Sequence, residues 1–251
     1  MTADPLIRAT AAEQAAALRR DLEATGWGVD SVHHLLGDAA DAALRREIRL
    51  PALRAVRAVL AEGTDSAPSW SVAVLTALFM LGEPVPATAL DAVLPRTGVS
   101  GARRIGLVGA PDEAGRVRAR VDLRPHEVRD DAGDVRWWIA SDLGELATGA
   151  PLAPDHVLGI GGAGLTLAGL TPRTPVRTAL DLGCGCGIQT LYLLRHAQHV
   201  VATDISARAL AFTAFNAALA AVAVKLAVHR LRREQQRQRR RGHERLFLLI
   251  G

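Results

Sequence analysis

The segment that most constrains the fold is the run of residues 176–204, in which four elements follow one another without a break. A short apolar run at 176–181 is typical of a buried strand, and a glycine-rich turn follows at 182–187. Apolar residues at helical spacing occupy 188–197, and a second apolar run at 199–204 ends in a carboxylate. This order predicts a βαβ unit with parallel strands, and therefore an α/β fold.

The glycines of the turn favour a ligand at the end of the first strand. Gly183, Gly185 and Gly187 are spaced as G-x-G-x-G, whereas the dinucleotide fingerprint G-x-G-x-x-G needs a glycine at the position of Ile188. Because glycine has no Cβ and accepts positive φ, the backbone can approach a ligand closely here. The spacing favours S-adenosylmethionine over NAD as the cofactor.

Two carboxylates flank this turn. Asp204 ends the second strand, 17 residues after Gly187, and suits the acceptor of hydrogen bonds from the two hydroxyls of a ribose. Asp181 ends the first strand, where we expect it to face the amino group of the ligand, directly or through water. Ser206 is a good N-cap for a helix that follows the second strand.

The stretches DLGCGCGIQTLYLL (181–194) and ATDISARALAFTAFNAALA (202–220) closely resemble class I S-adenosylmethionine-dependent methyltransferases, especially the branch of HemK-like protein-glutamine and nucleic-acid N-methyltransferases. The resemblance covers residues 155–221 and implies a Rossmann-like domain, in which the glycine-rich stretch 159–167 leads into the fold and covers the cofactor. It implies methyl transfer to a nitrogen of a nucleic-acid base or of a protein glutamine. The cofactor-binding residues that it implies are Asp181, Gly183, Cys184, Gly185, Gly187, Asp204 and Ile205.

One motif of that branch is missing. Its members carry Asn/Asp-Pro-Pro-Tyr/Phe after the fourth strand, where side-chain and backbone oxygens position the target nitrogen. The last proline of this sequence is Pro175, and the composition changes abruptly to Arg and Gln within 222–251. We therefore expect a truncated or frame-shifted C-terminus and an incomplete parallel sheet. No catalytic residue is assigned, and whether the chain transfers methyl groups stays open at this point.

The first 150 residues are predicted to be mainly helical. Apolar stripes with polar opposite faces predict helices at 11–26, 29–38, 41–63 with an interruption at Pro51, 69–81, 87–94 and 99–106. Strands are predicted next, one at 116–124 and one at 134–141. Helix, turn, helix and hairpin is the order of a winged-helix module, so we expect a winged-helix-like domain that recognises the substrate.

The predicted division of the chain is a helical and winged-helix-like domain at 1–150, a Rossmann-like half-domain at 151–221 and an atypical tail at 222–251, with a linker near 147–156. The net charge of +4 arises in the tail, which holds nine Lys and Arg against two acids. The Arg-rich run 230–245 is either a solvated, partly helical segment or a nucleic-acid contact. An alternative function is therefore nucleic-acid binding without catalysis, through the winged helix and the tail.

Other classes of protein are disfavoured. The sequence has no apolar run of 18 residues and no readable secretory signal, so we expect a cytoplasmic protein without a membrane partner. Its 29 Arg against one Lys suggest a GC-rich bacterial coding bias. Cys184 and Cys186 are the only cysteines, which excludes a disulfide framework, and the histidines at 33, 34, 196 and 199 lack ligand partners. No metal is expected.

Overall fold

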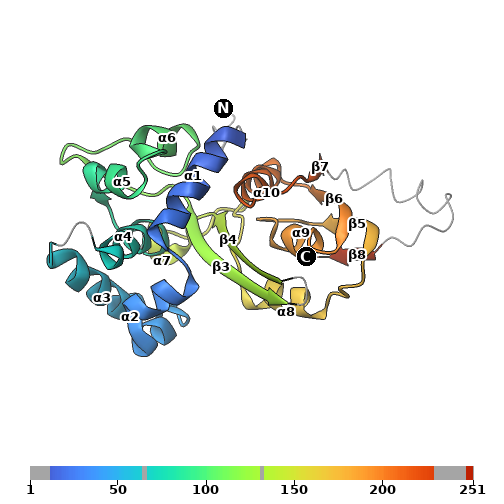
Figure 1. Cartoon of the computed structure of the whole chain (residues 1–251), viewed down its shortest axis with the longest axis horizontal. Helices are drawn as coiled ribbons and strands as arrows, with labels where there is room; N and C mark the ends of the chain where they lie inside the picture. The colour runs from blue at the N-terminus through green and yellow to red at the C-terminus, as the bar shows by residue number, and fades with distance from the viewer. Residues whose placement is uncertain (1–11, 64–66, 131–132, 229–246, 251) are drawn as a thin grey trace.

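The structure, a computed structural model, describes residues 12–63, 67–130, 133–228 and 247–250. A helical N-terminal part and a small parallel sheet lie on opposite sides of a long β-hairpin (Figure 1). The helices of the N-terminal part are α1 (Ala12–Thr25), α2 (Val29–Leu44), α3 (Leu50–Ala61), α4 (Pro68–Leu75) with its π-helical continuation η1 (Thr76–Met80), α5 (Ala87–Val93) and α6 (Gly98–Arg104).

The N-terminal helices confirm the predicted apolar stripes, with one correction. The predicted interruption at Pro51 is wrong. Helix α2 continues to Leu44 across a kink at Gly37, and the non-helical connection lies between Leu44 and Leu50, before the proline. Pro51 lies in the first turn of α3. Proline is favoured there because the first N–H groups of a helix have no intrahelical partner. The proline therefore starts a helix instead of interrupting one.

The strand predicted at 116–124 is divided in two. Its first residues form β2 (Arg116–Val117), which pairs with the short, unpredicted β1 (Val85–Pro86), and Val108 forms a bridge to Ala119. Its last residues begin the hairpin at Asp122. Along this segment, buried apolar residues alternate with exposed arginines, as is usual for a strand with one side in the core. The alternation ends at Asp122, which is buried and accepts from the Arg124 Nε–H at 2.8 Å. The winged-helix description of this part stays a prediction.

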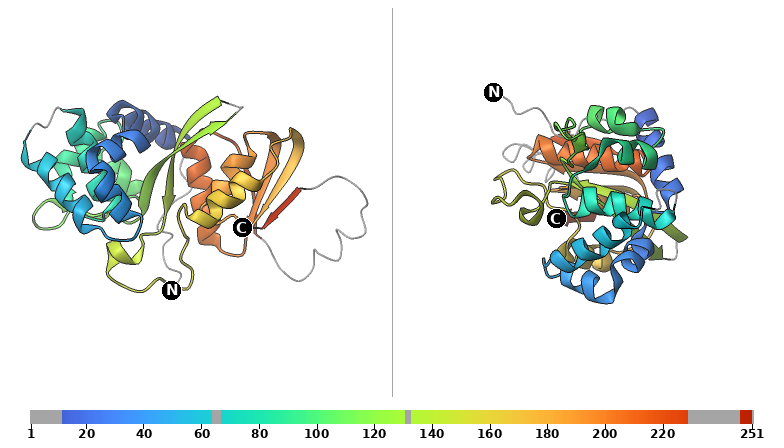
Figure 2. Two further views of the ribbon diagram at one scale, coloured as in Figure 1. Left: turned by 90° about the horizontal axis from the view of Figure 1, so that it is seen from below. Right: turned by 90° about the vertical axis from the view of Figure 1, so that its left-hand side faces the viewer.

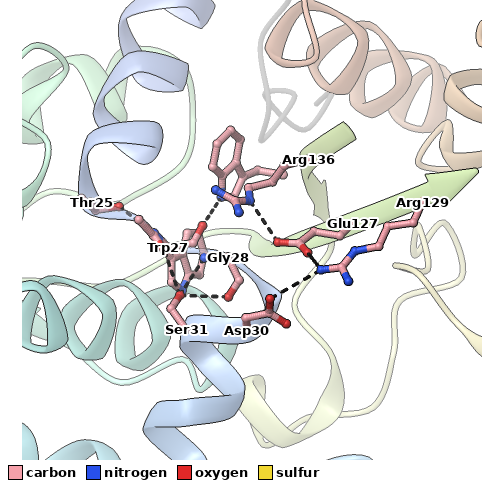
Figure 3. A network of polar contacts seen from close by, with 10 residues as sticks. Thr25, Trp27, Gly28, Asp30, Ser31, Glu127, Arg129 and Arg136 are labelled. Carbon is pink, nitrogen blue, oxygen red and sulfur yellow. Dashed lines mark hydrogen bonds and ion pairs between the residues drawn. The ribbon is translucent and has the colours of Figure 1, made fainter. Parts of the chain in front are cut away.

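The hairpin consists of β3 (Asp122–Asp130) and β4 (Gly133–Ser141), paired from Asp122 opposite Ser141 onward. It lies between the N-terminal helices and the parallel sheet in Figure 1 and in the left view of Figure 2. On the helical side, the Trp138 indole N–H donates to the Trp27 carbonyl at 2.9 Å. Figure 3 shows the neighbouring polar contacts: Glu127 accepts from Arg136 at 3.0 Å and pairs with Arg129, which also reaches Asp30 of α2.

The parallel sheet consists of β5 (Val176–Leu182), β6 (Ala197–Asp204), β7 (Lys225–Val228) and β8 (Phe247–Ile250), in the order β7-β6-β5-β8. The helices around it are α7 (Glu145–Thr148), α8 (Gly162–Leu170), α9 (Ile188–Leu193) and α10 (Ala207–Leu219). The βαβ unit predicted at 176–204 is confirmed, although α9 ends four residues before the predicted helix end at 197. Strands β7 and β8 fall within the predicted tail at 222–251, whereas its Arg-rich run at 230–245 lies outside the described residues.

The strand order indicates which end of the sheet suits a ligand. From β5 the chain adds β6 and then β7 on one side, and β8 pairs with β5 on the other side. The order therefore reverses at β5. In open α/β sheets, ligands bind beyond the carboxyl ends of the strands at such a reversal. The glycine turn, which follows β5 directly, lies at this position.

The largest buried apolar cluster runs through both halves of the molecule. It joins Leu22 and Phe79 of the N-terminal helices to Trp137 of the hairpin and to Phe212 and Phe215 of α10. The cluster therefore crosses the boundary predicted at residue 150. No helix in the described part of the chain is both long and apolar enough to cross a membrane.

A buried hydrogen bond between the α1–α2 connection and η1 offers a test of this packing. The Trp27 indole N–H donates to the Thr76 hydroxyl at 3.1 Å, and both residues are fully buried. We predict that Thr76→Val lowers the free energy of unfolding by about 1–3 kcal/mol, because it leaves the indole N–H unpaired. Urea titration measures this. The matched control Thr166→Val, on exposed α8, should change it by less than about 0.5 kcal/mol, and equal losses would contradict the prediction.

Candidate cofactor-binding site

The turn between β5 and α9 has three glycines with positive φ. These are Gly183 at 83°, Gly185 at 52° and Gly187 at 83°, as their spacing predicts. A Cβ at Gly187 would lie 2.9 Å from the Thr213 side chain, so this glycine lets the turn pack against α10. A Cβ at Gly185 would meet no atom within 4 Å, so this part of the turn borders open space. The turn is thus tight on one side and accessible on the other.

Backbone hydrogen bonds join this turn to the end of β6. The N–H groups of Gly183 and Cys184 both donate to the Thr203 carbonyl, at 2.8 and 3.0 Å. The Gly187 N–H donates to the Cys184 carbonyl at 2.7 Å, which closes the turn. These bonds bring the ends of two neighbouring strands together, so the carboxylates at the two ends belong to one site.

Asp204 lies at the predicted position but already has backbone partners. Its Oδ2 accepts from the Gly185 N–H at 3.0 Å and its Oδ1 from the Ser206 N–H at 2.8 Å. A carboxylate oxygen can accept two hydrogen bonds, so both oxygens keep acceptor capacity for a ribose. Ser206 caps α10 as predicted, by accepting from the Ala209 N–H. Ile205 lies beside this carboxylate with 68% of its surface exposed.

Asp181 is buried and incompletely paired. Its Oδ2 accepts from the Thr190 hydroxyl, whereas its Oδ1 has no hydrogen-bond partner. Burial raises the pKa of this carboxyl to about 6, although hydrogen bonds from Thr190 lower it. An orphaned carboxylate oxygen in a buried position calls for a donor that the protein does not supply. The charge and position suit an ammonium group.

The two cysteines of the turn are free and buried. Burial raises the pKa of Cys184 to about 12 and that of Cys186 to about 11. Both groups are therefore neutral thiols near pH 7, which makes them poor nucleophiles and poor metal ligands. The Cys184 sulfur lies 3.2 Å from the Thr213 hydroxyl. Its side chain faces α10, so Cys184 would contribute to a ligand site through its backbone.

Several polar residues that contact the turn or the helix after it were not predicted from the sequence to belong to the site. Gln189 is 95% buried, donates through Nε2 to the Gly164 carbonyl of α8 and leaves its Oε1 without a partner. Thr213 and Asn216 lie three residues apart on the buried face of α10 and both contact the turn. The signal that could have identified them is a polar residue at a helix position where the pattern calls for an apolar one. That α8 covers the cofactor stays a prediction.

Across 12–63, 67–130, 133–228 and 247–250, no group of three or more His, Cys, Asp or Glu is arranged to bind a metal ion. The residues that define the site are those of the glycine turn, together with Asp181 and Asp204.

The raised pKa of Asp181 gives a test with a defined sign. A carboxyl that binds a proton more readily in the folded state stabilises the fold below its ordinary pKa of 3.8, and this contribution is lost as the pH rises to about 6. Relative to Asp181→Asn, the wild type should therefore lose on the order of 3 kcal/mol of unfolding free energy between pH 4 and pH 7. Urea unfolding across this range measures it. Exposed Asp134→Asn is the control, and parallel profiles for wild type and Asp181→Asn would contradict the assignment.

Comparisons with known families separate the two halves of the chain. Residues 24–120 match the model "Domain of unknown function (DUF7059)", and residues 179–240 match the model "Methyltransferase domain". The hairpin lies between the two matched regions. No curated protein matches the chain. The second match begins within β5 and includes the glycine turn and Asp204, and it supports a class I S-adenosylmethionine-dependent methyltransferase domain in this half of the protein.

Proposed function

We propose that this protein binds S-adenosylmethionine at the glycine turn and transfers its methyl group to a nitrogen of a nucleic-acid base. The observation that carries the proposal is the turn itself, in which three glycines with positive φ lie at the reversal of strand order. The methyltransferase match to residues 179–240 supports the same cofactor.

The residues around the turn fit this cofactor. The open space at Gly185 admits a ligand close to the backbone. The unpaired Oδ1 of Asp181 would accept a hydrogen bond from the ammonium group of the methionine part. Asp204 would accept from the ribose hydroxyls, and the exposed Ile205 side chain would pack against the adenine.

In this proposal the protein promotes methyl transfer by holding the cofactor in a fixed orientation toward the acceptor nitrogen. Bound S-adenosylmethionine supplies a methyl group on a sulfonium, which a nearby nitrogen can attack without a covalent enzyme intermediate. The residues of the turn and the two carboxylates orient that cofactor, and orientation alone accounts for large rate effects in reactions of this kind. Because the sequence has no proline after Pro175, it lacks the Asn-Pro-Pro-Tyr motif, and binding is the primary readout of the proposal.

A nucleic-acid acceptor is supported by arginines outside this site. Arg103 lies in the last turn of α6, and Arg118 and Arg120 lie on the exposed side of the segment that pairs with residues 107–109. Within the described residues, none of these three guanidinium groups has a hydrogen-bond or ion-pair partner. Arg118 and Arg120, which alternate with buried residues and so face the same side of one segment, suit the phosphates of a nucleic acid, which guanidinium groups neutralise with release of counterions. The same surface would serve the alternative function, nucleic-acid binding without catalysis.

Calorimetry tests the cofactor. We expect S-adenosylmethionine and S-adenosylhomocysteine to bind, and Asp204→Ala to weaken both by about 10- to 100-fold, because hydrogen bonds to a charged acceptor contribute about 1.5–3 kcal/mol. Asp134→Ala, which removes an exposed carboxylate of the hairpin, should leave the affinity unchanged. The absence of binding heat at millimolar ligand would overturn the proposed cofactor.

Filter binding across a salt series tests the acceptor. Replacing Arg118 and Arg120 with Ala should weaken binding to RNA or DNA and reduce the slope of log affinity against log salt by about two, one for each lost phosphate contact. The control replaces Arg46 and Arg54, exposed arginines near α2 and α3, and should leave the slope unchanged. Equal effects of the two pairs, or no binding by the wild type, would favour a protein acceptor.

A further inference from the structure

The side chain of Asn216 joins the hairpin to the glycine turn. Asn216 lies on α10 and is fully buried. Its Oδ1 accepts from the Ala140 N–H of β4 at 2.8 Å, and its Nδ2 donates to the Ala140 carbonyl at 2.9 Å. The same Nδ2 donates to the Cys186 carbonyl in the turn at 2.8 Å. A single amide therefore binds backbone groups of both segments.

On the hairpin side, Asn216 takes the place of a strand partner. Ala140 is paired with Leu123 of β3, but its N–H and carbonyl both bond to Asn216. These groups therefore point away from β3, toward the free edge of β4. A buried backbone N–H and carbonyl must be paired, and an amide side chain offers one donor and one acceptor in matching positions.

On the turn side, the bond fixes the peptide between the last two glycines. The Cys186 carbonyl lies immediately before Gly187, where glycine allows the backbone many conformations. The Thr213 hydroxyl donates to the neighbouring Gly185 carbonyl at 3.1 Å. Asp204 binds the Gly185 N–H from the opposite side at 3.0 Å. The turn is thus held between α10 and the end of β6.

We propose that Asn216 is a positioning residue for the cofactor, which sets the conformation of the glycine turn relative to the hairpin. The inference rests on the proposed function and extends it to the hairpin, which contacts the N-terminal helices through Trp138. Its consequence is that cofactor affinity depends on a side chain that faces the backbone of the turn and of β4. Cofactor binding in turn should stabilise the hydrogen bonds at Ala140.

Two variants separate positioning from stability. Asn216→Ala removes all three hydrogen bonds, whereas Asn216→Asp keeps the size and the acceptor for the Ala140 N–H but cannot donate to either carbonyl. Each should weaken S-adenosylhomocysteine binding in calorimetry by at least about tenfold, or about 1.4 kcal/mol. The matched control is Thr76→Val, which removes a buried hydrogen bond far from the turn in sequence. It should lower the unfolding temperature while leaving the affinity at the wild-type value.

Hydrogen exchange on the unmodified protein gives a second readout, which decides the question if neither variant folds. S-adenosylhomocysteine should slow exchange of the Ala140 N–H as well as that of the turn. Wild-type affinity in both Asn216 variants, or protection confined to residues 181–206, would overturn the role of Asn216 alone. Failure of the wild type to bind S-adenosylhomocysteine would overturn the proposed function and this inference together.

Discussion

The arrangement of this protein depends on one buried amide. Asn216 pairs with both backbone groups of Ala140 and with the Cys186 carbonyl, so the hairpin, α10 and the glycine turn share a single set of hydrogen bonds. Leaving any of these buried groups unpaired costs more than an ordinary hydrogen bond contributes. The same hairpin packs on the N-terminal helices through Trp138. The two halves are therefore joined by polar contacts as well as by a common apolar core.

Contacts between the hairpin and the helices of the sheet reinforce this connection. Arg208 of α10 forms a bidentate ion pair with Asp142, whose Oδ2 also accepts from the Val157 N–H. At the other end, Arg195 binds Asp130, and its side chain is only 9% exposed. Partly buried, bidentate pairs of this kind specify geometry more than they add stability. They fix where α9 and α10 lie on the hairpin, and with them the turn.

The sequence predicted what local patterns encode. Apolar runs, helical spacing and glycine spacing were sufficient for β5, the turn, α9 and β6, because each depends on residues close in the chain. The break at Pro51 was placed wrongly because proline is compatible with a first helical turn, and the strand at 116–124 was divided because its first residues pair with β1. The glycine conformations followed from residue type, whereas Asn216 and Gln189 did not, because their partners are distant in sequence.

The central claim is that the turn at 183–187 receives an adenosyl cofactor whose ribose binds Asp204. The most direct measurement is a titration of isotope-labelled protein with S-adenosylhomocysteine, followed by the backbone amide resonances. We expect saturable shifts at Gly183, Gly185 and Ser206, whose N–H groups lie in the turn or beside Asp204. Shifts that leave these three amides unchanged, or no saturable shifts at all, would contradict it.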